Sequence, residues 1–221
     1  MEQLFQIDVV NISEQKAGFA GLFYFYLMPR VKSFDEEQVL QKAVELFWKK
    51  GYHATSMQDL VDYLGINRAS LYDTFGGKKE LFTQALTYYQ RSNSKILLNL
   101  LKQQPEVKIG LRHLLESAID AAVVDTDRKG CFMVNSSTEL LPADTALQQM
   151  ILANKENFEQ ALNDYLLSGQ LKGQFSSGKD TQAIAETIFT FYNGLKVITK
   201  IKPDKASLLQ QVNLLLLLLD N

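Results

Sequence analysis

Residues 34–82 carry four helical patterns in succession, and the two in the middle are unusually short. The first pattern has apolar residues at helical spacing on one side and ends with two lysines before Gly51. A second glycine, Gly65, separates the two short patterns and suits a tight turn between helices. This arrangement predicts a helix-turn-helix framed by two longer helices.

Side chains that can cap a helix stand at the start of these patterns. Asp35 precedes the first helix, and Ser56 precedes the second with Asp59 three residues later, which is an acidic form of the capping box. Asn67 precedes the third helix, which is predicted over residues 68–74. A fourth helix is predicted to begin at Lys78.

The same segment closely resembles the DNA-binding domain of the TetR family of one-component transcriptional regulators. The residues that match in order and spacing are Phe47, Gly51, Thr55, Ser56, Asp59, Leu60, Leu64, Gly65, Ile66, Leu71, Tyr72, Phe75, Lys78, Leu81 and Phe82. One position departs from the family pattern, because Thr74 stands where the family often has histidine. The resemblance implies an all-α protein with an N-terminal three-helix DNA-binding domain (34–82) and a C-terminal helical domain (83–221) that binds a ligand and dimerises.

The third helix would enter the major groove of DNA. Arg68 can donate in a fork to guanine, Asn67 and Ser70 can reach base edges or phosphates, and Ala69 can touch a thymine methyl. The resemblance adds Tyr72, Thr74 and Lys78 as contacts to the DNA backbone, and Thr55 and Ser56 lie where a helix N-terminus meets a phosphate. The alternative for each side chain is an ordinary solvated helix face and, for Ser56, a simple cap.

The charge balance limits non-specific binding to nucleic acid. From residue 28 to residue 89 there are as many Lys and Arg as Asp and Glu, and the whole chain has a net charge of −2. A general nucleic-acid binder would carry a basic face. Affinity is therefore expected from a few placed cations and from doubling in a dimer on a palindromic double-stranded DNA operator.

The remaining chain also has helical patterns throughout. Helices are predicted over 78–104, 106–124, 131–141, 143–169, 180–201 and 204–219, with Pro105, Pro142 and Pro203 closing three of them. The last two are strongly apolar, and residues 214–219 are six consecutive leucines. Such helices need cover on most sides, which predicts a homodimer through a four-helix bundle of residues 180–201 and 204–219. The alternative is burial within one subunit.

The middle helices are expected to enclose a small hydrophobic or aromatic effector. The predicted pocket residues are Tyr88, Leu97, Leu101, Ile119, Phe132, Met133, Phe158, Leu162, Tyr165 and Phe189. The alternative is that this aromatic stripe is plain core. A polar cluster at 135–139 would either orient the ligand or cap and solvate a short helix.

Cys131 is the only cysteine, which excludes an internal disulfide and fits a cytoplasmic protein. It follows Lys129 and would lie near a helix N-terminus, and both features favour a reactive thiolate. Electrophile or oxidant sensing is one interpretation, and a small buried apolar residue is the other. His53 and His113 are isolated, so no metal site and no cofactor are expected.

Residues 1–33 do not fit the pattern of the rest. The apolar run at 17–28 is too short to span a bilayer and lacks the basic flank of a secretion signal, so no membrane span and no secretion signal are expected. If it is translated, the segment could be a peripheral membrane tail or an aggregation-prone tail. Met28 is expected to be the true initiator, with residues 1–27 untranslated or disordered.

Together these features predict a sequence-specific DNA-binding transcriptional regulator, most simply a repressor released by a small hydrophobic ligand. The alternatives are a regulator that senses electrophiles through Cys131 and a helical protein-interaction module without DNA binding. No enzyme is expected, since the chain lacks paired acids, a nucleophile–base arrangement and a phosphate-binding loop.

Overall fold

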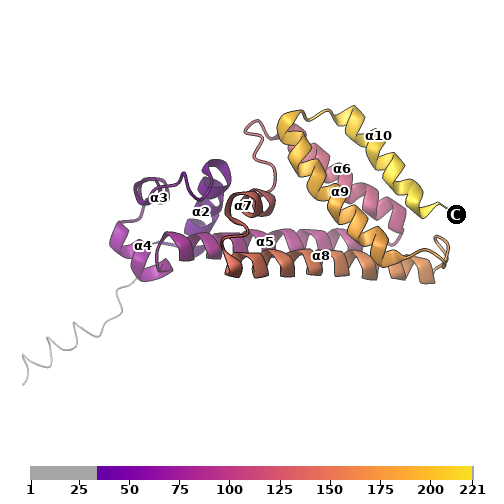
Figure 1. Cartoon of the computed structure of the whole chain (residues 1–221), viewed down its shortest axis with the longest axis horizontal. Coiled ribbons are helices and arrows are strands. Elements are labelled where there is room, and N and C mark those ends of the chain that lie inside the picture. Colours follow the sequence, from indigo (N-terminus) through magenta and orange to yellow (C-terminus); the bar gives the residue numbers. More distant parts are fainter. Residues whose placement is uncertain (1–33, 221) are drawn as a thin grey trace, which may run out of the picture. The chain divides into compact units, whose positions relative to one another are not determined.

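The computed structural model describes residues 34–220, and within that range the chain forms nine α-helices and no β-strand (Figure 1). This confirms the all-α prediction. The predicted extension at 1–33, with the expected start at Met28, lies outside the described residues. The helices are α2 (Glu36–Lys50), α3 (Met57–Leu64), α4 (Arg68–Phe75), α5 (Lys78–Gln103), α6 (Val107–Val124), α7 (Phe132–Leu140), α8 (Thr145–Leu171), α9 (Thr181–Ile201) and α10 (Lys205–Leu216).

The predicted caps of the short helices are confirmed. The Ser56 hydroxyl accepts a hydrogen bond from the backbone N–H of Asp59 at 3.1 Å, and the Asp59 carboxylate accepts one from the Ser56 N–H at 2.7 Å. The Asn67 side chain accepts from the Ser70 N–H at 2.8 Å. Gly65 has φ 72°, a left-handed conformation that a residue with a Cβ adopts only with strain. These local interactions set where α3 and α4 begin.

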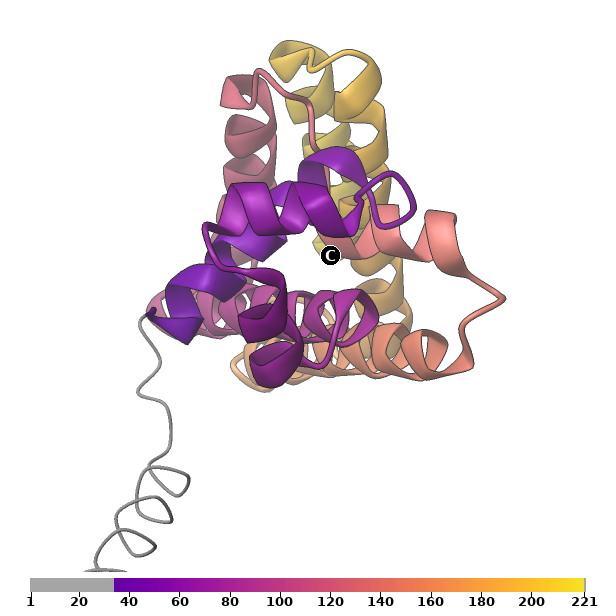
Figure 2. The ribbon, with the colours of Figure 1, turned by 90° about the vertical axis from the view of Figure 1, so that its left-hand side faces the viewer.

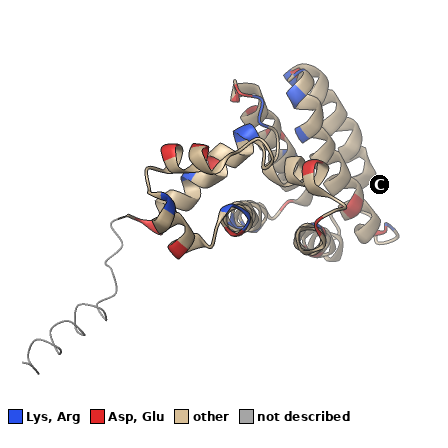
Figure 3. Ribbon diagram, turned by 60° about the vertical axis from the view of Figure 1, so that its left-hand side comes forward, with Lys and Arg blue, Asp and Glu red and all other residues tan. Residues whose placement is uncertain are grey.

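Helices α2 to α4 pack around a small aromatic core and rest on the first turns of α5. Phe47 of α2 and Phe82 of α5 are buried, with ring centroids 5.1 Å apart in an edge-to-face arrangement. Leu60 and Leu71 complete this core from α3 and α4. In Figure 2 these helices face the viewer, and Figure 3 shows acidic and basic segments interspersed over them.

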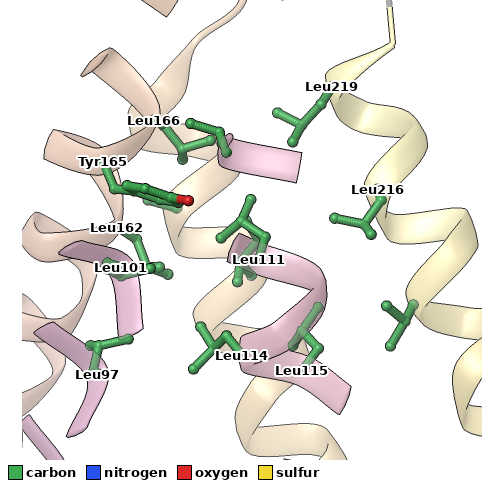
Figure 4. Close-up of a cluster of buried hydrophobic side chains, with 14 of the residues drawn as sticks. Leu97, Leu101, Leu111, Leu114, Leu115, Leu162, Tyr165, Leu166, Leu216 and Leu219 are labelled. Atoms are coloured by element: carbon green, nitrogen blue, oxygen red, sulfur yellow. The ribbon is translucent and has the colours of Figure 1, made fainter. Parts of the chain in front are cut away.

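The C-terminal part is a bundle in which α5 lies along α8, α9 packs on both α6 and α8, and α10 packs on α6. Its leucine-rich core, seen in Figure 4, joins α5, α6, α8 and α10. Tyr165 enters this core and donates a hydrogen bond to the carbonyl of Gln104 at 2.6 Å. An added Cβ at Gly110 would lie 2.0 Å from the Tyr165 hydroxyl, so the close approach of α6 and α8 requires glycine there.

From Glu36 onward the chain forms one compact unit, in which the predicted domain boundary at residue 82 falls inside α5. The division into a DNA-binding part and a ligand-binding part therefore stays a functional prediction. Within residues 34–220 no helix is both long and apolar enough to cross a membrane.

The six-leucine run departs from the predicted single helix to residue 219. α10 ends at Leu216, and a 3₁₀ turn (Leu217–Leu219) follows it. Leu216 and Leu219 are buried, whereas Leu214, Leu217 and Leu218 are 68%, 55% and 41% exposed. The bundle of one chain therefore covers only part of this apolar segment.

Candidate nucleic-acid interface and ligand pocket

Helix α4 presents a polar face opposite its buried side. Leu71 and Phe75 point into the core, while Arg68, Ala69 and Tyr72 are exposed. Asn67 is also exposed, and its amide NH₂ stays available after its oxygen has capped the helix. Ser70 and Thr74 are half-buried at the edges of this face.

Tyr72 is held so that its hydroxyl can reach outward. Its side chain is 46% exposed, and the Arg68 guanidinium lies 6.0 Å from its ring centroid. An added Cβ at Gly77 would lie 3.3 Å from the Tyr72 ring. Gly77 has φ 137°, so both its conformation and this close approach favour glycine. The ring is thus braced, while the polar end stays in solvent.

The N-terminus of α5 lies directly after α4. Gly77 provides no side-chain cap there, so the first N–H groups of α5 can meet an anion. The ammonium of Lys78 lies 4.4 Å from the centroid of the Tyr52 ring. Burial lowers the pKa of Lys78, while the carboxylates of Glu139 and Asp59 act in the opposite direction. Lys78 is the first residue of α5 and directly follows Gly77, whose backbone approaches the Tyr72 ring.

Thr55 does not suit the predicted contact with DNA. Its side chain is fully buried, and its hydroxyl donates to the carbonyl of Gly51 at 2.6 Å. Its backbone N–H donates to the carbonyl of Tyr52 at 3.3 Å. Because both donors are engaged inside the fold, Thr55 shapes the turn after α2 rather than facing a phosphate. Ser56 is exposed and acts as the predicted cap.

A cavity of about 230 Å³ lies between α5, α6, α7, α8 and α9. Its walls are mainly apolar and include Leu97, Leu114, Met133, Phe158 and Phe189. This volume is below the usual range for ligand pockets, about 300–1,000 Å³, so the cavity suits only a compact ligand. Of the predicted pocket residues, Leu97, Met133, Phe158 and Phe189 line this cavity.

The other predicted pocket residues lie elsewhere. Leu101, Ile119, Leu162 and Tyr165 belong to the bundle core, so the alternative interpretation as plain core holds for them. Phe132 is buried with its ring centroid 5.6 Å from those of Phe82 and of Tyr89. Tyr88 bonds to α2, because its hydroxyl accepts from the Gln41 amide at 2.8 Å and donates to Glu37 at 3.2 Å. The neighbouring Tyr89 lines the cavity instead.

The polar side of the cavity gathers Tyr89, Cys131, Tyr192 and Lys196. The Tyr89 hydroxyl donates to the sulfur of Cys131 at 3.8 Å, and the Lys196 ammonium lies 5.2 Å from the Tyr192 ring centroid. Burial raises the pKa of Tyr192 to about 12 and lowers the pKa of Lys196. Lys196 and Tyr192 were not among the predicted pocket residues, since neither belongs to a motif and only packing directs them into this cavity.

The polar cluster at 135–139 does not line the cavity. Ser136 donates to the carbonyl of Phe132 at 2.8 Å, and Asn135 donates to that of Lys129 at 2.8 Å. Glu139 extends to the turn after α2 and accepts hydrogen bonds from the N–H groups of Tyr52 and His53. The cluster therefore holds α7 in place and connects it to the turn after α2.

Comparison with known proteins agrees with this geometry. Residues 39–85 match the family model for bacterial regulatory proteins of the tetR family. The HTH-type transcriptional regulator YezE of Bacillus subtilis (strain 168) is 33% identical over 195 residues, which cover 87% of this chain and 100% of YezE. The HTH-type transcriptional repressor ComR of Escherichia coli (strain K12) is 29% identical over 76% of this chain and 80% of ComR.

One solved structure is similar to this chain over most of the length of both proteins. It is a cysteine mutant of the TetR family transcriptional regulator CifR in complex with 26 bp double-strand operator DNA. It superimposes with a TM-score of 0.77 at 26% sequence identity and covers 85% of this chain and 98% of CifR.

Proposed function

The chain belongs to the TetR family of helix-turn-helix transcriptional regulators, and from this premise we propose that it is a dimeric repressor released from its operator by a small ligand. The observation that supports the proposal most directly is the geometry of α4. This helix has a buried side on the core and an exposed side with Arg68 and Tyr72, next to the uncapped N-terminus of α5.

In the proposed complex, α4 enters the major groove. Arg68 donates to a base edge, Asn67, Ala69 and Ser70 contact bases or phosphates, and Tyr72 bonds to the backbone. Ser56, Thr74 and Lys78 would also contact the DNA backbone. Thr55 would not, because its side chain is buried. A protein that acts on chromosomal DNA works in the cytoplasm, which is the location we propose.

The proposed homodimer forms through α9 and α10. Ile198 and Ile201 of α9 are 49% and 70% exposed, and Leu214 of α10 is 68% exposed. Exposed apolar residues on these two consecutive helices, which both pack on α6, favour burial against a second copy. Two recognition helices related by a two-fold axis would read a palindromic operator.

Two helices connect the proposed ligand cavity with the DNA-binding part. α5 runs from Lys78 beside α4 to the cavity wall at 89–100, and α7 runs from Met133 at the cavity to Glu139 at the turn after α2. Ligand binding would shift either helix and change the spacing of the two recognition helices. DNA and ligand would then favour different arrangements of the same dimer.

The experiment that tests this proposal is a selection of bound genomic DNA fragments in vitro with the purified full chain, followed by sizing of the complex. A short palindromic site bound by two copies is the expected result. Enrichment without a shared sequence, obtained with folded dimer at low salt, would contradict it.

The position of Cys131 supports a second candidate function, sensing of electrophiles. The half-buried thiol lines the cavity, receives a hydrogen bond from Tyr89 and shares the wall with the Lys196 ammonium. The Tyr89 hydroxyl and the Lys196 ammonium thus place a donor and a cation on the same wall as the sulfur. The Cys131 thiol would add across an activated alkene, with its sulfur bonding to one carbon and its proton going, through water, to the adjacent carbon.

N-ethylmaleimide separates the two functions. If Cys131 is the sensor, one equivalent releases the protein from its operator, and the Cys131→Ser variant binds the operator but does not respond. Release of both proteins to the same extent, or of neither, would contradict this second function.

A further inference from the structure

A second, more polar cleft adjoins the cavity. It measures about 580 Å³ and is bounded by Trp48 of α2, by α5 and α6, by the 125–130 loop and by the end of α9. The cleft and the cavity share four residues, namely Tyr89, Asn93, Ala121 and Lys196. The Lys196 side chain therefore stands where an apolar chamber meets a polar entrance.

The entrance carries cations without carboxylate partners. In the part of the chain that the structure describes, Lys196, Arg128 and Lys200 form no ion pair. Arg128 donates only to the carbonyl of Ile201 at 3.2 Å, and Lys200 donates to the Asn135 amide oxygen at 3.1 Å. Because the Ile201 carbonyl and the Asn135 amide are uncharged, they do not neutralise the positive charge of Arg128 and Lys200.

The two acids of the cleft are already engaged. Asp127 pairs with Lys49 at 3.0 Å, and Asp125 accepts a hydrogen bond from the backbone N–H of Lys129 at 2.7 Å. Asp125 also pairs with the Lys129 ammonium at 3.9 Å, and neither carboxylate forms an ion pair with Lys196. A cation in this position is the feature that an acidic ligand would use.

A neutral donor lies one helical turn from Lys196. Tyr192 precedes it by four residues on α9, so both side chains leave the same face of the helix. Within residues 34–220 the Tyr192 hydroxyl makes no hydrogen bond, and the centroid of its ring lies 5.3 Å from that of Phe158. An ammonium and a free hydroxyl thus border the same cavity beside apolar walls.

We infer that the ligand of the proposed regulator is a small organic acid, with its apolar body among Leu97, Phe158 and Phe189 and its carboxylate between Lys196 and Tyr192. This inference rests on the proposed ligand-responsive function and names the chemical class of the ligand. A carboxylate would supply a charge-assisted hydrogen bond to Lys196 and accept another from the Tyr192 hydroxyl. It would also restore favourable surroundings to an ammonium whose charge is opposed by burial.

Matched probes test the acidic group separately from the apolar body. Phenylacetate, 3-phenylpropionate and hexanoate are each compared with the neutral amide of the same carbon skeleton at pH 7. Binding to the full chain, without DNA, is measured by titration calorimetry and by the fluorescence of Trp48, the only tryptophan, on the cleft wall. At least one acid is expected to bind about tenfold more tightly than its amide, a difference of about 1.4 kcal/mol.

Substitutions test which side chains cause the preference for the acid over the amide. Lys196→Gln is expected to reduce the affinity for the acid to that for the amide, and Tyr192→Phe to reduce it about threefold. Lys202→Gln is the matched control, because Lys202 pairs with Asp204 outside both the cavity and the cleft. If Lys196→Gln fails to fold, two measurements still test the inference. They are the comparison of acid with amide on the unaltered chain and the affinity of the Tyr192→Phe variant for the acid.

Equal binding of acid and amide, absence of binding by all three acids, or an acid preference that survives Lys196→Gln would overturn the inference. Operator binding is measured in a separate assay. Acid binding without operator binding would therefore contradict the proposed function alone, and operator binding without acid preference would contradict the inference alone.

Discussion

The carboxylate of Glu139 accepts a hydrogen bond of 2.7 Å from the backbone N–H of His53, across the junction between α7 and the turn after α2. The second oxygen accepts from the N–H of Tyr52 at 3.0 Å. Gly51 precedes this turn with φ 85°, and an added Cβ there would lie 3.1 Å from the Glu139 carboxylate. One side chain of α7 thus holds the start of the helix-turn-helix through its backbone.

Replacement of Glu139 by alanine is expected to loosen this junction. Two backbone N–H groups lose a charged acceptor, which should destabilise the fold by about 1 kcal/mol and lower the melting temperature by roughly 2–4 °C. Hydrogen exchange at Tyr52 and His53 should accelerate, while Glu139→Gln, which keeps one acceptor, should show a smaller effect. Glu156→Ala, at an exposed position of α8, is the control. Unchanged exchange at both amides would show that the junction does not depend on Glu139.

Replacement of Arg68 by alanine should weaken operator binding without loss of stability. Removal of one bidentate contact to a base typically costs about 1–3 kcal/mol. The side chain is exposed on α4, so the melting temperature should stay constant. Fluorescence anisotropy with labelled operator measures the affinity. Arg91→Ala is the control, because it removes the same charge from an exposed position on α5. Equal affinities of the two variants would argue against α4 as the reading helix.

The capping box of α3 should become less stabilising in acid. The Lys50 ammonium, at 2.7 Å, and then the hydrogen bonds from Ser56 hold the pKa of Asp59 well below its usual value of 3.8. A lowered pKa in the folded state means that the stabilisation is present above about pH 3.8 and is lost as the pH falls below it.

Urea unfolding of Asp59→Asn therefore has a defined pH dependence. At pH 7 this variant should unfold at a lower urea concentration than the unaltered chain, and the difference should narrow at pH 3. Asp62→Asn, in the same helix, serves as the control. A gap of the same size at both pH values would mean that the ionised carboxylate contributes nothing through this box.

The proposed dimer should be sensitive to charge on the exposed leucines. Leu214→Glu together with Leu217→Glu places two carboxylates on positions that are 68% and 55% exposed in one chain, so a single subunit should still fold. In a dimer these positions would lose contact with water, which makes their charge costly. Sedimentation velocity is expected to show monomer, whereas Leu98→Glu on α5, also 55% exposed, should remain dimeric. Dimers in both variants would place the interface elsewhere.

The sequence by itself determined the helices and the reading motif, because these depend on neighbours in the chain. Ser56 with Asp59, and Asn67 with Ser70, form their caps over three residues, so their spacing could be read directly. The exposed side of α4 also follows from the spacing of Leu71 and Phe75.

The tertiary structure alone decided which side chains meet around the cavity. Successive residues of a helix point about 100° apart, so Tyr88 bonds to α2 while Tyr89 reaches Cys131. The rotation of α9 that brings Tyr192 and Lys196 to the same chamber depends on how α6 and α8 pack against it. Contacts between residues as distant as His53 and Glu139 arise only when the helices dock, because no local periodicity encodes the rotation of one helix relative to another.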